Sequence, residues 1–194
     1  MMENDNEEQT KKEISMNLVR TSKFLSLVLR HQPDVIGMQL DPEGWLEIDA
    51  LIANANKHGK HLSLELIHEV VANCDKQRFA LSEDGLYIRA NQGHSVEGVE
   101  LNLEPLEPPE TLFHGTVPNF IDSILQQGLQ KRSRNHVHLS SDRETATKVG
   151  QRRGKPIILV VNSAIMHRDG FEFFRSANGF WLTAHVPPKY LSRP

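Results

Sequence analysis

Apolar residues recur every three or four positions in three stretches of the N-terminal half, which is the spacing of one helix face. The first 15 residues carry no such stripe, and we expect segment 1–15 to be a mobile, charged tail. The pattern predicts helices over 18–30, 50–57 and 64–73, a turn at 41–44 and a short strand over 45–48. The N-terminal half is therefore mainly helical.

Capping and breaking residues bound these helices. Pro33 ends the first helix, because proline cannot continue it and disfavours helical geometry in the residue before it. Arg30 and His31 then lie at the helix C-terminus, where the helix dipole favours cations whatever their function. Asp49 and Ser63 are the expected N-caps of the second and third helices.

A hairpin follows the third helix. Segments 79–81 and 86–89 are β-prone, and the Asp84-Gly85 pair between them is typical of a tight turn. Three helices, a short strand and a terminal hairpin predict a winged-helix lobe over residues 16–95. Residues 96–110 contain three prolines, five glutamates and no base, and we expect them to form an acidic linker.

Short β-type runs and two helices fill the remainder of the chain. Strands are predicted at 111–114, 136–139, 156–161 and 180–183, with helices over 118–127 and 143–149. The expected fold class is α+β, with a second lobe over residues 111–194 that is rich in short strands.

Composition narrows the class of protein. Of 194 residues, 38% are hydrophobic, which excludes wholesale disorder. The polar N-terminus predicts no signal peptide, and no apolar run approaches the roughly 20 residues that span a bilayer. Cys74 is the one cysteine, so intramolecular disulfides and cysteine-based zinc sites are excluded, and a reducing cytoplasm is expected.

Charge is unevenly distributed along the chain. The whole sequence has 22 bases and 25 acids, yet segments 1–13 and 95–111 together hold ten of those acids and only two bases. The remainder has 20 bases against 15 acids, an excess that permits an anionic partner and is equally compatible with an ordinary soluble surface.

Two polar clusters could bind an anion. Arg30-His31 is the first, and Arg89 with the segment after it is the second. The side chains in that segment that can donate hydrogen bonds to an anion are those of Asn91, Gln92, His94 and Ser95. An ordinary exit from a hairpin explains these polar residues equally well.

Three further motifs lie in the second half. His114-Gly115-Thr116 follows a strand, where Gly115 would let a ligand approach closely, although a satisfied core histidine is the commoner outcome. His136 and His138 share a strand face and could hold a metal, but no third ligand is spaced nearby, so we expect none. The basic run 148–155 fits a solvated loop, and Trp181 fits the core.

Taken in order, these stretches closely resemble the RNA 2′-phosphotransferase family. The resembling segments are 22–31, 44–45, 88–95, 113–116, 137–140, 149–152 and 178–183. The resemblance implies an N-terminal winged-helix lobe, a C-terminal ADP-ribosyltransferase-like lobe, and NAD consumed as a co-substrate without a metal. It also implies an RNA substrate bearing an internal 2′-phosphate.

The family reaction has two steps. The RNA 2′-phosphate attacks the anomeric carbon of the nicotinamide ribose and nicotinamide leaves; the 2″-hydroxyl of the ADP-ribose then attacks phosphorus. The products are 2′-hydroxyl RNA, nicotinamide and ADP-ribose 1″,2″-cyclic phosphate. Because the first nucleophile is already an anion, the reaction needs a positioned phosphate rather than a general base.

The resemblance carries over to particular residues. The catalytic set would be Arg30, His31, Arg89 and Arg152, with Arg153 as a competitor for the last position. Guanidinium groups suit this role because they bind phosphate through two parallel hydrogen bonds. The NAD-binding set would be His114, Gly115, Thr116, His138, Leu139, Ser140, Asn178 and Trp181. The phosphate is then expected between the two lobes.

Two other functions stay open at this point. The chain could be an ADP-ribosyltransferase acting on another phosphate or a base of a nucleic acid, or a winged-helix binder without catalysis. No glutamate stands in a matching context near 178–183, which argues against modification of proteins. We expect a cytoplasmic monomer without membrane association that takes part in tRNA processing, although no residue names the physiological RNA.

Overall fold

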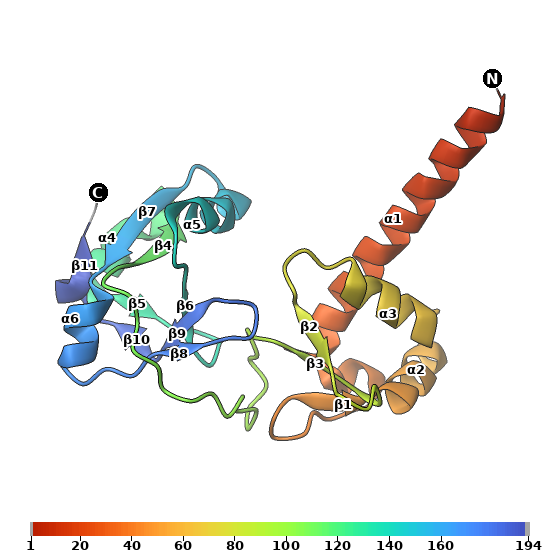
Figure 1. The fold of residues 1–194 in the computed structure, drawn as a ribbon, viewed down its shortest axis with the longest axis horizontal. Helices are drawn as coiled ribbons and strands as arrows, with labels where there is room; N and C mark the ends of the chain where they lie inside the picture. The colour runs from red at the N-terminus through yellow and green to blue at the C-terminus, as the bar shows by residue number, and fades with distance from the viewer. Residues whose placement is uncertain (1, 193–194) are drawn as a thin grey trace. The chain divides into compact units, whose positions relative to one another are not determined.

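The structure, a computed structural model, describes the backbone of residues 2–192 and the side chains of residues 13–192. The chain divides into two compact units, Met1–Leu101 and Asn102–Pro194, and the division falls inside the segment predicted as a linker. Helices and strands are mixed in both units (Figure 1), which confirms the α+β class. Each unit is described by itself below.

Unit 1 contains three helices and one small sheet. Its elements are α1 (Met2–Val28), the 3-10 helix η1 (Pro33–Ile36), β1 (Trp45–Glu47), α2 (Ile48–Lys57), α3 (Leu64–Ala72), β2 (Phe79–Leu81) and β3 (Tyr87–Ala90). The sheet is antiparallel with the order β1-β3-β2. Its core is formed by apolar side chains from all three helices and the sheet, among them Leu25, Leu51, Ile67 and Ile88, all fully buried.

Two of the three helix starts in unit 1 differ from the sequence prediction, and α1 ends at Val28 rather than at Arg30. α1 begins at Met2 and not near Leu18, so residues 2–15 belong to the helix backbone; Met1 lies outside the described residues, and the mobility of segment 1–15 stays a prediction. The prediction of Asp49 as an N-cap is wrong: the N-cap is Glu47, because buried Ile48 already starts the helix at the end of β1. Ser63 is confirmed as a cap, since its Oγ accepts a hydrogen bond from the Leu66 amide at 3.2 Å.

The predicted hairpin is confirmed. β2 and β3 pair with Ala80 opposite Arg89, and the turn between them is closed by a hydrogen bond from the Ser82 amide to the Tyr87 carbonyl at 3.0 Å. Gly85 occupies the left-handed region of this turn (φ +73°), where a side chain would be strained. β3 also pairs with β1, and there Arg89 lies opposite Trp45.

Unit 2 is built from short strands and three helices. Its elements are β4 (Leu112–Thr116), α4 (Pro118–Gln127), β5 (Leu129–Gln130), β6 (Val137–Leu139), α5 (Arg143–Gly150), η2 (Gln151–Arg153), β7 (Ile157–Val161), α6 (Ser163–Arg168), β8 (Phe174–Arg175), β9 (Trp181–Thr183), β10 (His185–Val186), η3 (Pro188–Tyr190) and β11 (Leu191–Ser192). All four predicted strands and both predicted helices are present.

The strands of unit 2 form three small sheets, with the orders β11-β7-β4, β6-β9-β8 and β10-β5. A bridge between Phe113 and Ser140 places β6 beside β4. The apolar core of this unit includes Leu112, Leu139, Leu159 and Phe173, all fully buried. This arrangement positions the motifs on β4 and β6 next to each other.

The segment predicted as a linker is bonded at both ends. The Glu100 amide donates to the Pro42 carbonyl at 2.8 Å in unit 1. In unit 2 the Leu106 amide donates to the Phe173 carbonyl at 2.8 Å, and Ser163 Oγ donates to the Pro109 carbonyl at 2.6 Å. Within residues 2–192, none of the helices has both the length and the apolar character to cross a bilayer.

Candidate active site

Arg30, His31 and Arg89, three of the four residues predicted to be catalytic, belong to one site in unit 1. Arg30 and His31 follow the last turn of α1, and Arg89 lies in the middle of β3. The backbone after β3 returns to the helix end, where the Ser95 amide donates to the Arg30 carbonyl at 2.8 Å. His31 Nδ1 and Ser95 Oγ share a hydrogen bond of 2.8 Å. Residues 91–95 therefore join the helix end to the strand.

Arg30 lies over a glycine. A Cβ on Gly93 would lie 3.7 Å from Arg30 Nη1, and the positive φ of Gly93 (+84°) disfavours any side chain there. The second terminal nitrogen of the guanidinium, Nη2, donates a hydrogen bond to the Arg78 carbonyl at 3.4 Å. The Arg30 guanidinium is thus placed by backbone groups on two sides.

Arg89 is held by an aromatic ring. Its guanidinium carbon lies 4.4 Å from the centre of the Trp45 ring, directly across the β1–β3 pair. Such a cation–π contact contributes about 0.5–2 kcal/mol and holds the guanidinium over the ring. The Arg89 Nε is buried and has no hydrogen-bond partner among the described residues. Trp45 is itself held by the Asp41 turn, whose Oδ1 accepts from the Trp45 amide at 2.7 Å.

His94 lies buried behind these cations. Burial is the largest cause that lowers its pKa, and the positive charges of Arg30, His31 and Arg89 act in the same direction; together they bring the pKa to about 4. His94 is therefore a neutral imidazole at neutral pH. Its Nε2 faces Gly44, where an added Cβ would lie only 2.9 Å away.

The side chains of segment 91–95, predicted to bind an anion, do not all have the same surroundings. Asn91 is buried, and its Nδ2 donates to the Gln77 carbonyl at 2.6 Å. This side-chain amide therefore joins the end of β3 to the backbone just before β2. Ser95 is bonded to His31, which orients the imidazole. Of the side chains in this segment, Asn91 and Ser95 thus have structural partners within unit 1.

The motifs on β4 and β6 meet in unit 2. His114 Nδ1 donates to the His138 carbonyl at 3.1 Å, which leaves Nε2 as the acceptor atom of the ring. Burial lowers the pKa of His114, so the ring is neutral at neutral pH. Ser140 is buried and exchanges two backbone hydrogen bonds with Phe113, at 2.8 and 2.9 Å. Thr116 ends the same strand and is also buried.

Gly115 is required for a reason that the sequence does not reveal. A Cβ at this position would lie 1.9 Å from the Ala146 carbonyl oxygen of α5. The missing side chain therefore lets α5 pack against β4, and on that face no ligand approaches Gly115.

The remaining members of the predicted NAD-binding set have core or turn positions. Leu139 and Trp181 pair across β6 and β9, and both side chains belong to the core of unit 2. Leu139 can therefore offer only its backbone to a ligand. Asn178 lies in the turn before β9, where its Oδ1 accepts a hydrogen bond from Ser176 Oγ at 2.8 Å.

Comparison with known proteins identifies the family. Residues 16–185 match the family model described as "RNA 2'-phosphotransferase, Tpt1 / KptA family". The chain belongs to this family. It is 67% identical over 177 residues to a probable RNA 2′-phosphotransferase of Rhodopirellula baltica, covering 91% of this chain and 96% of that protein. A similarly named protein of Flavobacterium johnsoniae is 58% identical over 170 residues, with 88% and 93% coverage.

Family membership directs attention to the cations of unit 2. Arg152 and Arg153 are both exposed on η2, and both act on Arg134, whose pKa is lowered first by burial and then by these two charges. The structure does not distinguish Arg152 from Arg153. Because Arg152 belongs to unit 2, its place beside Arg30, His31 and Arg89 stays a prediction.

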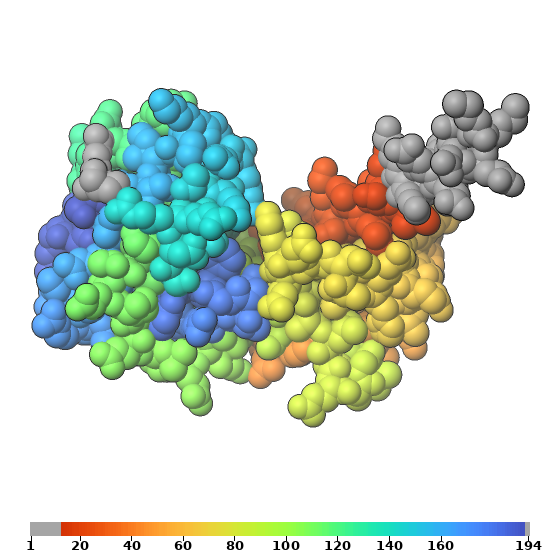
Figure 2. All heavy atoms as spheres, turned by 45° about the horizontal axis from the view of Figure 1, so that its top comes forward, coloured from red at the N-terminus to blue at the C-terminus, as the bar shows by residue number. Residues whose placement is uncertain are grey.

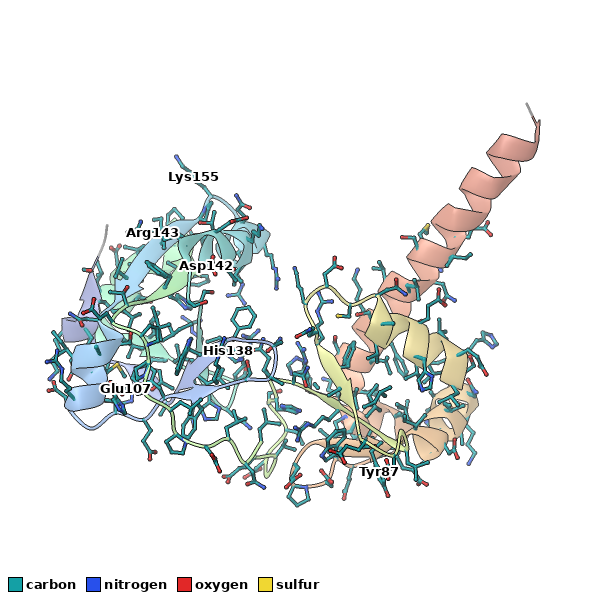
Figure 3. All side chains as sticks on the ribbon, viewed as in Figure 1. Tyr87, Glu107, His138, Asp142, Arg143 and Lys155 are labelled. Atoms are coloured by element: carbon teal, nitrogen blue, oxygen red, sulfur yellow. The ribbon has the colours of Figure 1, made fainter. Side chains whose placement is uncertain are left out.

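Arg134 is a residue that sequence reasoning missed. It precedes the His136-Val137-His138 run by two positions, and its charge also contributes to the lowered pKa of His114. Figure 3 labels His138 on β6, and Asp142 and Arg143 at the start of α5. Among the described side chains, no group of three histidine, cysteine or acidic residues could hold a metal ion.

Proposed function

We propose that this chain is an RNA 2′-phosphotransferase that removes an internal 2′-phosphate from RNA with NAD as co-substrate. The observation that carries the proposal is that Arg30, His31 and Arg89 lie around the same buried residue, His94, in unit 1 of a chain that belongs to this family. Three helices with the sheet β1-β3-β2 support a winged-helix lobe. The short strands of unit 2 support an ADP-ribosyltransferase-like lobe.

Each residue of the cluster has a definite task toward a phosphate. Arg89, held over the Trp45 ring, would offer parallel N–H groups to two phosphate oxygens. Arg30 is fixed by the Arg78 carbonyl and adds a second guanidinium. His31, oriented by Ser95, donates to a third oxygen when protonated. Each charge-assisted hydrogen bond contributes about 1.5–3 kcal/mol, so the set can hold a phosphate dianion without a metal.

Unit 2 would hold the dinucleotide. NAD supplies the ADP-ribosyl group that accepts the phosphate. Buried hydroxyls of Thr116 and Ser140, next to the neutral His114, fit the polar groups of a ribose. Arg134 and the two η2 arginines fit an anionic ligand, and Arg152 would stabilise the charge that develops when the second step forms the cyclic phosphate.

The test uses a synthetic RNA that carries one internal 2′-phosphate. Loss of that phosphate only when NAD is present supports the proposal. Accumulation of a stable ADP-ribosylated RNA instead favours an ADP-ribosyltransferase of nucleic acid. Absence of any reaction despite tight RNA binding overturns the enzymatic function altogether.

Variants separate the two proposed half-sites. Arg30→Ala and Arg89→Ala should each lower turnover at least 100-fold while NAD affinity changes less than two-fold. Thr116→Val and Ser140→Ala should weaken NAD binding instead. Equal loss of NAD affinity in both pairs contradicts the assignment of phosphate and dinucleotide to different units.

A further inference from the structure

A long groove runs along α1 in unit 1 and is separate from the residues assigned to catalysis, except at one end. Its volume is about 980 Å³. One wall is a face of α1, and the other is formed by the end of α3 and the segment that leads to β2. In Figure 2 the red surface of α1 meets the yellow surface of this second wall. The lining residues from α1 are Ile14, Ser15, Leu18, Val19, Ser22, Lys23, Ser26 and Leu27.

The groove lining combines three kinds of side chain. Isoleucine, leucine and valine side chains supply the apolar part of the lining, and serine hydroxyls occur along α1 at positions 15, 22 and 26. Cations also line the groove at Lys23, Lys76 and Arg78. Two acids, Glu69 and Asp75, also line it, so the balance is positive by one charge. Apolar contacts with spaced hydroxyls and cations fit the sugars, bases and phosphates of a nucleic-acid strand.

One end of the groove is continuous with the phosphate site. His31 lines the groove and is also bonded to Ser95. Arg78 lines the groove, and its carbonyl accepts the hydrogen bond from Arg30 Nη2. A strand lying in the groove would therefore reach the cluster that would hold its 2′-phosphate.

We propose that this groove binds the single-stranded RNA on one side of the 2′-phosphate. The inference rests on the proposed function, since it deepens the description of the same substrate. No phenylalanine, tyrosine or tryptophan lines the groove, and its one aromatic ring is that of His31 at the end next to the phosphate cluster, so base stacking contributes little along the groove. Recognition then depends on the sugar–phosphate backbone, and the bases adjoining the 2′-phosphate affect affinity only weakly.

A length series of substrates tests the proposal. A minimal 2′-phosphorylated dinucleotide does not reach the groove, whereas an oligonucleotide with several nucleotides on each side does. Lys23→Glu and Lys76→Glu should each raise KM for the long substrate about tenfold and leave turnover of the dinucleotide within two-fold. Each lost phosphate contact should also reduce the slope of log affinity against log salt by about 0.7.

The matched control is Lys57→Glu, which makes the same charge change at the end of α2, outside the groove. It should leave KM for both substrates within two-fold. A rise in KM with this variant equal to that of Lys23→Glu overturns the proposal, because net charge alone would then explain the effect.

Cys74 provides a second, independent measurement. It lines the groove, takes part in no disulfide, and is the one cysteine of the chain, so a thiol reagent reports on the groove alone. The long oligonucleotide should slow alkylation of Cys74 about tenfold in the wild type and not in the Lys23→Glu variant. The dinucleotide should not slow it.

Three outcomes overturn the inference. Equal protection of Cys74 by dinucleotide and long RNA shows that the groove is not occupied by flanking nucleotides. Protection that rises with protein concentration in the absence of RNA assigns the groove to a second copy of the chain, for which the exposed Ile14 and Val19 would be the contact. A wild type that acts on neither substrate defeats the proposed function, and the inference with it, whereas turnover without length dependence defeats the inference alone.

Discussion

Replacing Gly44 by alanine should destabilise unit 1 through His94, the buried histidine beside the proposed phosphate site. Gly44 has a φ of +83°, and an L-residue in the left-handed region costs roughly 1–2 kcal/mol. The new Cβ would also lie 2.9 Å from His94 Nε2 and 3.3 Å from Val99 Cγ1, a degree of overpacking that costs about 1–3 kcal/mol. The expected loss is about 3 kcal/mol in the free energy of unfolding.

Gly37→Ala is the matched control. Gly37 also has a positive φ (+68°), but nothing lies within 4 Å of its missing Cβ, so only the backbone cost of roughly 1–2 kcal/mol applies. Urea unfolding followed by Trp45 fluorescence, in a Trp181→Phe background, measures both variants. Equal losses for the two glycines would refute the contact with His94.

The pH dependence of stability gives a second readout of the same contact. The pKa of His94 is about 4 in the folded chain and near its ordinary value of 6.5 in the unfolded chain. Between pH 6.5 and 4 the unfolded state therefore binds a proton that the folded state does not, and stability falls by about 3 kcal/mol as the pH drops. Gly44→Ala should flatten this dependence by pushing His94 toward solvent. An unchanged dependence in the variant shows that His94 stays where it is.

Three further changes have definite expected outcomes. Arg89→Lys should lower turnover of 2′-phosphorylated RNA at least tenfold without changing NAD affinity, because an ammonium neither stacks flat on Trp45 nor binds two oxygens in parallel; steady-state kinetics with both substrates checks this. Gly115→Ala should destabilise unit 2 by about 3 kcal/mol or prevent its folding, since the new Cβ would collide with the Ala146 carbonyl; a melting temperature close to that of the wild type would contradict this prediction. Ser63→Ala should cost about 1 kcal/mol in urea unfolding through loss of the α3 cap, and Ser63→Asp should retain it.

Local signals were enough to predict most elements of the fold. The α3 cap at Ser63, the Asp84-Gly85 turn and the apolar runs of unit 2 all act over a few residues, and the structure contains the elements they predict. The elements that sequence reasoning missed are the two-residue strands, the 3-10 helices η1, η2 and η3, and the six-residue helix α6, all of which are too short to show a period. Asp49 failed as a cap because burial of Ile48, a tertiary effect, set the helix start.

Sequence reasoning could indicate a residue of the candidate site only where a neighbouring residue in the chain or the family resemblance pointed to it. The position of Arg30 and His31 at the end of the first helix follows from Pro33, whereas their catalytic assignment, like that of Arg89, comes from the resemblance and stays a prediction. The stack of Arg89 on Trp45 could not be predicted from spacing, because it depends on the register of two strands separated by about 40 residues. Arg134 carries no local signal, since its neighbours Arg152 and Arg153 come from a different element.

The hairpin turn at Ser82–Gly85 has a consequence for enzymes built on this lobe. Side chains on a strand alternate between its two faces, so inserting or deleting a single residue in that turn would rotate Arg89 away from Trp45 while leaving every residue of the phosphate cluster unchanged in identity. The length of this turn thus sets which face of the sheet carries the guanidinium. Engineered loop grafts at this position should preserve the length of the turn before any attention is given to its sequence.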